Sequence, residues 1–320
     1  QAFGTDDQLG YQFTTRAKEQ LLRAHALTYT KQLPWRHTLR LIGSYSESDI
    51  PPSRADGLDV DTESWQLGAR YSMPFEWSEL NDTLTFGADF KRNENGFVLE
   101  GFDLSDAGSV TDVTQFSATY QLQQSVGKGA FSGGSTLIYS PGGIGGHNNK
   151  DDFTSGGDAE YAIAQFNANY QRPLPRAFTL TIRSRAQITS DSLLGSEQFS
   201  MGGYTTVRGY DASEANKDSG IFISTELRSP RVPWLQQKIE SIASDRIQGI
   251  VFIDYATLSD KDNTANNQHA DLFSVGLGAR YSIAQNLSAR FDYGWQLKDS
   301  GENGTSGRNR RAHMGLQFSF

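Results

Sequence analysis

One Gly-rich stretch, residues 196–210, concentrates the residue types that could do chemistry; it reads SEQFSMGGYTTVRGY. Its single cation, Arg208, lies among aromatic and β-branched residues. The paired glycines Gly202 and Gly203 allow positive φ angles or a close approach of two backbones. An arginine buried among apolar neighbours needs an anionic partner. The stretch therefore predicts a loop folded into the protein with Arg208 at its tip, and the alternative is an ordinary hairpin connection with a surface arginine.

Other patterns that could support catalysis or ligand binding are weak. The glycines between residues 142 and 146 resemble a phosphate loop only superficially, because no helix pattern follows them, so a surface loop is favoured. No nucleophile-elbow motif is present. The histidines lack metal-ligand spacing; they are His25, His37, His147, His269 and His313. We therefore expect no catalytic site, no metal and no cofactor, and we do not expect an enzyme.

Composition narrows the class of protein. The chain has 320 residues, a net charge of -8 and no cysteine. The absence of cysteine excludes a disulfide scaffold and a thiolate metal site, and the mildly acidic balance gives no reason to expect nucleic acid as a partner. The chain contains no run of 18 apolar residues, so no membrane-spanning helix is predicted, and no signal peptide is visible. Its low mean hydropathy is compatible with a membrane barrel, because only alternate strand residues face lipid.

The elements that must position Arg208 are long alternating segments. In residues 287–298, one face carries Leu, Ala, Phe, Tyr, Trp and Leu, and the other carries Ser, Arg, Asp, Gly, Gln and Lys. Segments of roughly ten such residues suit tilted membrane strands, with one face for lipid and one for water. Fourteen strands are predicted, at 8–16, 21–31, 37–46, 64–73, 83–92, 113–123, 130–140, 160–171, 178–188, 219–229, 247–257, 271–283, 287–298 and 311–320.

A soluble β-sandwich is the competing architecture, because its strands alternate too. Its strands are nearer five or six residues and its polar face usually lies outside. The longer segments and the successive charges on their polar faces favour a water-filled transmembrane barrel. A short amphipathic helix at 234–243 is the only helical candidate.

The connections form two alternating sets. Short connections marked by proline follow residues 29, 71, 170 and 227, and proline ends a strand because it cannot donate to the ladder. The long polar connections are 47–62, 93–111, 141–157, 190–218, 258–270 and 299–310. This asymmetry is typical of bacterial outer-membrane barrels, so the proline-marked side is predicted to be periplasmic. The chain ends on alternating apolar residues and Phe320, which resembles the signal read by outer-membrane assembly machinery.

The motifs around Arg208 resemble a known family. Residues 196–210, followed by Asp218-Ser219-Gly220 and the sequence ELRSP at 226–230, resemble the signature of two-partner secretion transporters. These TpsB proteins form the haemolysin secretion/activation branch (ShlB/FhaC/HecB-like) of the Omp85/BamA superfamily. The run LLGSEQF at 193–199 and Phe252-Ile253-Asp254 fit as well. In looser form the resemblance covers nearly the whole chain.

The resemblance implies a fold and a domain organisation. The family has a 16-stranded antiparallel up-and-down barrel, preceded by two periplasmic POTRA domains, and its sixth extracellular loop folds into the lumen with Val-Arg-Gly-Tyr at the tip. Loop 190–218 precedes five predicted strands, as in the family, but follows about nine strands where the family has eleven. Residues 1–320 are therefore expected to be one barrel domain in which the POTRA domains and the first two strands are absent.

Two carboxylates are candidate partners for Arg208. Alternation places Glu226 and Asp254 on the water-facing sides of adjacent strands. Alternation alone leaves open whether they bind Arg208 or line a wet lumen, and the resemblance implies the pairing. The hypothesis is a latch formed by Gly202, Gly203, Val207, Arg208, Gly209 and Tyr210 with these two carboxylates. Six further charged residues are expected to be hydrated pore lining: Arg183, Arg185, Arg280, Arg290, Asp292 and Lys298.

The resemblance also implies a function and partners. It implies an outer-membrane pore of a Gram-negative bacterium that exports a large exoprotein of haemolysin or adhesin type from the periplasm to the cell surface. The expected partners are that passenger, outer-membrane lipid and the assembly machinery that reads Phe320. The alternatives are an insertase that assembles outer-membrane proteins, a passive porin, and a soluble adhesin-like β-protein.

Overall fold

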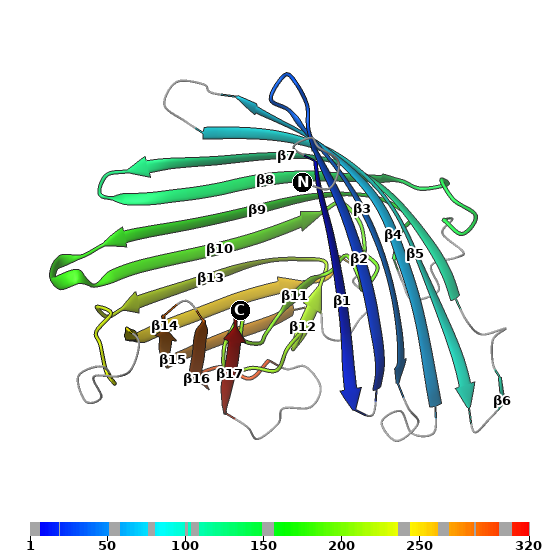
Figure 1. Cartoon of the computed structure of the whole chain (residues 1–320). Helices are drawn as coiled ribbons and strands as arrows, with labels where there is room; N and C mark the ends of the chain where they lie inside the picture. Colours follow the sequence, from blue (N-terminus) through cyan, green and yellow to red (C-terminus); the bar gives the residue numbers. More distant parts are fainter. Residues whose placement is uncertain are drawn as a thin grey trace. The chain divides into compact units, whose positions relative to one another are not determined.

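The computed structural model is almost entirely β-structure (Figure 1). It describes residues 7–18, 20–50, 58–75, 81–99, 102–103, 109–148, 157–235, 244–261, 269–284, 286–300 and 309–319. The strands are β1 (Gln8–Lys18), β2 (Gln20–Gln32), β3 (Thr38–Ile50), β4 (Leu58–Phe75), β5 (Asn81–Leu99), β6 (Phe102–Asp103), β7 (Ser109–Val126), β8 (Gly129–Pro141), β9 (Glu160–Pro173), β10 (Thr179–Thr189), β11 (Phe199–Met201), β12 (Ala215–Lys217), β13 (Ser219–Arg228), β14 (Asp245–Ser259), β15 (His269–Ile283), β16 (Leu287–Gln296) and β17 (Arg310–Phe318). A 3-10 turn, η4 (Pro175–Ala177), joins β9 to β10.

The strands follow an up-and-down order. In the described residues, the sheet runs β1-β2-β3-β4-β5-β7-β8-β9-β10-β13-β14-β15-β16-β17, while β6 pairs only with β5 and β11 pairs with β12. Those fourteen strands are the fourteen that alternation predicts, with nine before loop 190–218 and five after it. No helix in the described part of the chain is long and apolar enough to cross a membrane.

Several strands extend into segments predicted as loops. The ladder between β4 and β5 runs from the pair Leu58–Leu99 to the pair Phe75–Asp82, so the predicted loops 47–62 and 93–111 are too long. An antiparallel ladder pairs the backbone N–H and C=O groups of polar segments as well as apolar ones. The polar composition of these segments therefore does not end the strand.

Three predictions from the sequence are not confirmed: one is wrong, and two concern residues that lie mostly or wholly outside the described part of the chain. The connection after Pro230 is not short: it extends over residues 229–244, and Val232 bridges to Ile247 on β14. The predicted helix at 234–243 lies mostly outside the described residues, which omit 236–243. Phe320 lies outside them too.

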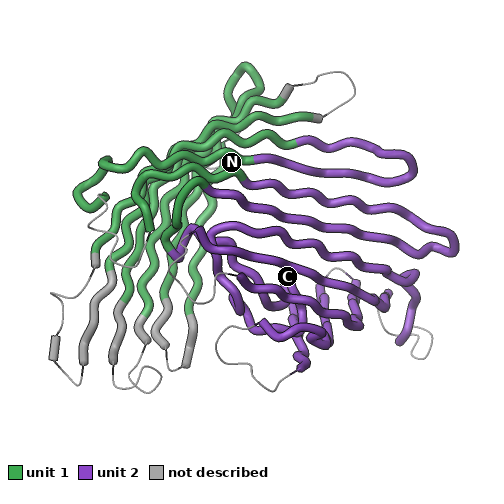
Figure 2. The backbone as a smooth tube through the Cα atoms, turned by 180° about the vertical axis from the view of Figure 1, so that it is seen from behind, with its two compact units in different colours: residues 1–121, 136–164, 190–194 green, residues 122–135, 165–189, 195–320 purple. Residues whose placement is uncertain are grey.

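The chain divides into two compact units (Figure 2). Unit 1 contains residues 1–121, 136–164 and 190–194, and unit 2 contains residues 122–135, 165–189 and 195–320. Arg208 and the charged residues predicted around it all belong to unit 2. The single-domain organisation of residues 1–320 stays a prediction.

In unit 1, a buried carboxylate holds the Gly-rich loop of residues 142–146. Asp112 is fully buried and accepts two hydrogen bonds from Arg92, from Nε at 2.6 Å and from NH2 at 2.8 Å. Its Oδ2 also accepts the backbone N–H groups of Gly146 and His147, at 2.9 and 3.2 Å. The loop is exposed, as predicted, and its amides bind a carboxylate of the same chain.

Replacing this carboxylate should destabilise unit 1. Asp112→Asn removes the charge that pairs with Arg92 and one of the acceptors for the loop amides, so we expect the free energy of unfolding to fall by about 2–4 kcal/mol. Urea unfolding of the protein in detergent measures this change. Glu160→Gln is the control, because that exposed carboxylate accepts only one side-chain bond, from Tyr139, and its loss should cost below about 1 kcal/mol. Equal effects of the two substitutions would contradict the assignment.

In unit 2, the strands separate an apolar exposed face from a buried face that carries both polar and apolar side chains. On β14, Val251, Ile253 and Tyr255 are 39–52% exposed, whereas Phe252 and Asp254 are 1% and 0% exposed. On β13 the residues of the exposed face include Ile221, Ile223 and Leu227, and those of the buried face are Phe222, Ser224 and Glu226. The period of two in a strand puts Glu226 and Asp254 on the same side of adjacent strands.

Candidate functional site

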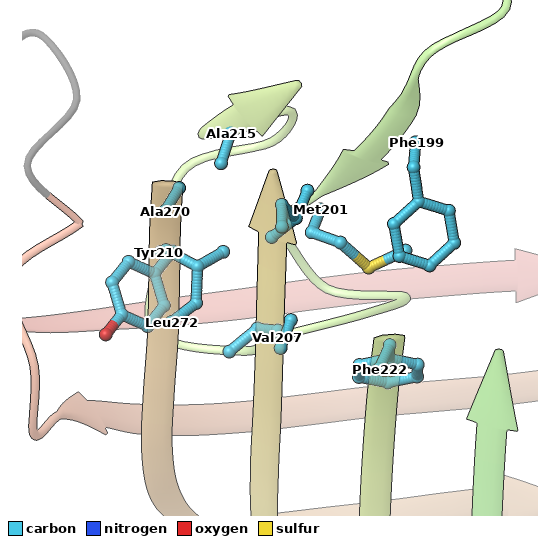
Figure 3. Close-up of a cluster of buried hydrophobic side chains, with 10 residues drawn as sticks. Phe199, Met201, Val207, Tyr210, Ala215, Phe222, Ala270 and Leu272 are labelled. Atoms are coloured by element: carbon cyan, nitrogen blue, oxygen red, sulfur yellow. The ribbon is translucent and has the colours of Figure 1, made fainter. Parts of the chain in front are cut away.

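Loop 190–218 joins β10 to β13, and its residues 195–218 are packed as part of the core of unit 2. Strands β11 and β12 pair within it, from Phe199–Lys217 to Met201–Ala215. Its apolar side chains contact residues of β13, β14 and β15 in one buried cluster (Figure 3). The cluster consists of Phe199, Met201, Val207, Tyr210, Ala215, Phe222, Ala256, Leu258, Ala270 and Leu272. Burial of this apolar surface holds the loop against the strands independently of any charge.

The glycine pair turns the chain toward the tip of the loop. Gly202 and Gly203 have φ angles of +111° and +94°, which L side chains rarely adopt. A Cβ atom on Gly202 would lie 2.4 Å from the carbonyl oxygen of Asp211, so a side chain has no space there. Thr206 closes the turn, because its hydroxyl donates to the Gly202 carbonyl at 2.8 Å and accepts the Gly202 N–H at 3.0 Å.

Arg208 is fully buried and is held mainly by Asp254 and Glu226. Its Nε and NH2 donate to the two carboxylate oxygens of Asp254 at 2.7 and 2.8 Å, and its backbone N–H donates to Asp254 Oδ2 at 3.0 Å. NH1 donates to Glu226 Oε1 at 2.6 Å, and NH2 donates to Ser224 Oγ at 3.3 Å. The bidentate contact fixes the orientation of the guanidinium as well as its position.

Phe252 forms the base of the arginine site. Its ring lies beneath the guanidinium, with Arg208 Cζ 3.5 Å from the ring centroid, which is a desolvated cation–π contact. The ring needs the space beside Gly276, where a Cβ atom would approach Phe252 Cζ to 2.2 Å. The arginine site therefore depends on Gly276 of β15, which leaves room for the Phe252 ring and has no side chain to contact Arg208.

A third carboxylate, Asp292 of β16, completes what we call the ion cluster: Arg208, Glu226, Asp254 and Asp292. Its Oδ1 lies 3.5 Å from Arg208 NH1, and it also binds Arg280 at 2.9 Å and Arg290 at 2.5 Å. The prediction that Asp292 is hydrated pore lining is wrong, because the residue is 0% exposed. A carboxylate at this depth needs charged or hydrogen-bonding partners, and the three arginines supply them to Asp292.

The arginines around the ion cluster bind its outer oxygens. Arg228 donates to Glu226 Oε2 from Nε at 2.9 Å and from NH2 at 2.6 Å. Arg183 NH2 lies 3.5 Å from Glu226 Oε1. Burial lowers the pKa of the Arg208 guanidinium, but the hydrogen bond to Asp254 and the three nearby carboxylates outweigh burial and raise that pKa above its usual value. Arg208 therefore stays charged.

The other predicted lining residues lie apart from Arg208. Arg185 is exposed and its guanidinium lies 5.8 Å from the centroid of the Phe199 ring. Lys298 forms an ion pair with Asp271. Both contact the region around loop 190–218, and their role as pore lining stays a prediction.

The backbone next to Arg208 is bound by residues that the sequence analysis did not select. Gly209 donates its N–H to His313 Nε2 at 3.3 Å, and its carbonyl accepts Gln296 Nε2 at 2.7 Å. A Cβ atom on Gly294 would lie 2.7 Å from Gly209 N and 2.8 Å from Arg208 C, so two backbones meet there. Alternation along β16 does place Gly294 and Gln296 on the same face as Asp292, which is the signal that could have selected them.

Tyr210 anchors the far side of the tip through its hydroxyl group. The side chain is 0% exposed, and the hydroxyl donates to the Lys298 carbonyl at 2.5 Å and accepts the Phe273 N–H at 3.0 Å. Tyr210→Phe leaves both backbone groups unpaired, so we expect the free energy of unfolding to fall by about 1–3 kcal/mol. Tyr204→Phe, at a half-exposed position of the same loop, should change it by under about 0.5 kcal/mol. Thermal unfolding in detergent compares the two, and equal shifts would contradict this role.

The family of the chain follows from a comparison with family models. The model described as "Haemolysin secretion/activation protein ShlB/FhaC/HecB" matches residues 1–281. The chain belongs to this family. The predicted resemblance is thereby confirmed, and the match includes loop 190–218 and strands β13 and β14 with Glu226 and Asp254.

Individual relatives of this ShlB/FhaC/HecB family chain are distant. A heme/hemopexin transporter protein, HuxB, from Haemophilus influenzae (strain 86-028NP) is 27% identical over 138 residues, which are 43% of this chain and 24% of HuxB. CdiB from Escherichia coli superposes with a TM-score of 0.73 at 16% identity, covering 93% of this chain and 53% of that one. CdiB from Acinetobacter baumannii gives 0.72 at 14% identity, covering 98% and 54%.

The likeness extends beyond HuxB and the two CdiB structures. BamA from Haemophilus ducreyi lacking POTRA domains 1-3 superposes with a TM-score of 0.57 at 12% identity, covering 98% of this chain and 70% of that one. At such identities these likenesses show the fold alone, and they confirm the predicted class, an all-β antiparallel barrel fold. The chain spans about half the length of the CdiB structures and a quarter of HuxB.

Proposed function

We propose that this chain is the barrel part of a two-partner secretion transporter. It exports a large exoprotein of haemolysin or adhesin type from the periplasm to the cell surface of a Gram-negative bacterium. Membership of the ShlB/FhaC/HecB family supports this assignment. The observation that carries it is the burial of Arg208 between Asp254 and Glu226, because a passive pore gives no reason for a long loop held by a buried ion cluster.

The distribution of side chains on the strands supports the outer-membrane location. Apolar residues such as Ile253, Val251 and Leu277 are about half exposed, although they alternate with buried residues such as Phe252, Asp254 and Gly276. Large apolar side chains on the outer face of long antiparallel strands suit contact with lipid hydrocarbon. The buried face then lines the interior. The proposed partners are outer-membrane lipid, the passenger and the outer-membrane assembly machinery.

The ion cluster gives loop 190–218 a latch role in this function. The loop carries the cation, and three different strands, β13, β14 and β16, carry the carboxylates. Binding one guanidinium to three strands fixes the loop and the wall of the barrel relative to each other. Transport through the interior of the barrel then depends on whether loop 190–218 stays docked on these strands or is released from them. Val207, Gly209, Tyr210 and the glycine pair support the latch by packing and by hydrogen bonds.

Deletion of the gene tests the function. If the chain is an exporter, deletion leaves the passenger encoded beside it in the periplasm, and complementation restores the passenger to the cell surface. Fractionation and immunoblotting of the passenger measure this distribution. A broad loss of outer-membrane proteins on deletion would indicate an assembly insertase instead. Unchanged surface passenger with lost uptake of small solutes would indicate a passive porin.

A further inference from the structure

Unit 2 contains a pocket whose charge the latch does not explain. The pocket has a volume of about 520 Å³ and is lined by five arginines, Arg228, Arg231, Arg246, Arg280 and Arg290, together with Tyr204 of loop 190–218. No aspartate or glutamate of the described residues lines it. It lies beside the connections that follow β13 and β15. We call it the arginine pocket.

The five arginines fall into two groups. Arg228 binds Glu226, and Arg280 and Arg290 bind Asp292, so these three already have one carboxylate partner each. Arg231 and Arg246 are exposed, and no carboxylate of the described residues lies within ion-pair distance of either. Asp245 is a buried carboxylate that contacts Tyr281, which lines the pocket. Among the described residues around the ion cluster and the pocket, the cations still outnumber the carboxylates. The cations are Arg183, Arg208, Arg228, Arg231, Arg246, Arg280 and Arg290, and the carboxylates are Glu226, Asp245, Asp254 and Asp292.

This excess of cations occurs in a chain whose net charge is -8. A concave site with one sign of charge focuses its field and raises the local concentration of ions of the opposite sign. Guanidinium groups bind carboxylate and phosphate through parallel hydrogen bonds, and they remain charged at every physiological pH. The arginine pocket therefore has the chemistry of an anion site with several binding positions.

We propose that the arginine pocket binds an acidic segment of extended polypeptide, and that this segment belongs to the exported passenger. The identity of the passenger as its source rests on the proposed function. The volume lies within the range of about 300–1,000 Å³ that is usual for organic ligands, and it exceeds what one small anion fills. Ser288 and Gln317 also line the pocket and supply uncharged groups that can pair with peptide amides.

The pocket shares a wall with the latch. Tyr204 comes from loop 190–218, and Arg290 holds it by donating to its carbonyl at 2.5 Å and by stacking on its ring at 4.6 Å. Undocking of the loop would remove this wall. Binding of the acidic segment and docking of the loop are consequently linked, and each stabilises the other.

A binding measurement on the full-length protein in detergent tests the pocket. The probe is a fluorescein-labelled hexaglutamate peptide, followed by fluorescence anisotropy at about 20 mM and about 500 mM NaCl. We expect saturable binding at low salt that is lost at high salt. Arg231→Gln combined with Arg246→Gln should weaken it about tenfold, because both substitutions remove charges that have no other described partner.

The control removes two arginines from another part of the same unit, one at the end of β9 and one in η4. Arg172 and Arg176 are exposed and do not line the pocket, so Arg172→Gln combined with Arg176→Gln should leave the affinity within about twofold of wild type. Equal weakening by both pairs, or no saturable binding, would overturn the proposal. Displacement of the peptide by inorganic phosphate at equal concentration would overturn the peptide assignment and indicate a small-anion site.

Export of the passenger separates this proposal from the proposed function. Normal export by a protein that does not bind the peptide would overturn the pocket and leave the exporter intact. The opposite outcome is also informative. If the peptide binds through Arg231 and Arg246 but deletion of the gene leaves the passenger at the cell surface, the proposed export function is overturned. The passenger is then no longer the source of the acidic segment.

Discussion

Arg208→Ala should reduce export of the passenger to the level of the gene deletion, while the protein still assembles in the outer membrane. The substitution removes the group that joins Asp254, Glu226 and Asp292, and it leaves the Asp254 carboxylate buried with few donors. Breaking a buried pair in this way costs about 3–5 kcal/mol. Because the apolar cluster and the strand ladders remain, the cost should undock the tip of the loop rather than unfold unit 2. Immunoblotting of surface and periplasmic passenger measures the effect.

Two matched variants make this result specific. Arg208→Lys keeps a charge, but an ammonium group is a point donor that cannot make the bidentate contact with Asp254, so we expect export well below wild type. Arg172→Ala removes an exposed arginine of the same unit and should export normally. Normal export by Arg208→Ala in an assembled protein would rule out the latch.

Gly294→Ala should undock the same loop without changing any charge. The added Cβ atom would lie 2.7–2.8 Å from backbone atoms of Arg208 and Gly209, so the tip or β16 must move. Such overpacking costs about 1–3 kcal/mol, and a shift of the tip lengthens the short bonds between Arg208 and Asp254. We therefore expect a large loss of export, measured in the same way.

The control for this substitution is a glycine of β14, which is separated from β16 by β15. Gly249→Ala on β14 places its Cβ atom 3.6 Å from Ser229 Oγ, which is ordinary van der Waals contact, so export should be unchanged. Combining Gly294→Ala with Arg208→Ala should be no worse than Arg208→Ala alone, because both act on one contact. Additive losses from the two substitutions would show that Gly294 acts elsewhere.

The strands were predictable because their signal is local. A period of two over ten residues is strong in β13 and β14, and there one face of the strand is exposed and the other is buried. Strand ends were less predictable. The ladder between β4 and β5 continues through polar residues, and polarity does not oppose pairing where both strands are present.

Residues of the site could be predicted from the sequence only where the face of the strand on which a side chain lies is enough to place it. Glu226 and Asp254 follow from alternation and from the family resemblance, and the structure brings both to Arg208. Asp292 lies on the corresponding face of its strand. Alternation does not show how far along a strand the loop tip reaches, so the sequence alone predicts that Asp292 is hydrated lining. Gly276 and Gly294 act through the space that they leave, which needs coordinates to detect.

The burial of the loop tip can be measured directly by thiol labelling. The chain has no cysteine, so Val207→Cys introduces a single thiol at a residue that is 0% exposed beside Arg208. Tyr204→Cys, at a half-exposed position of the same loop, is the control and should react quickly with a maleimide in every background.

The latch predicts that the thiol of Val207→Cys reacts slowly in assembled protein, and that adding Arg208→Ala accelerates it on the order of 100-fold, which corresponds to release of a buried pair. Equally fast labelling of Val207→Cys with and without Arg208 would contradict the account, because the tip would then be exposed whether or not the ion cluster is intact.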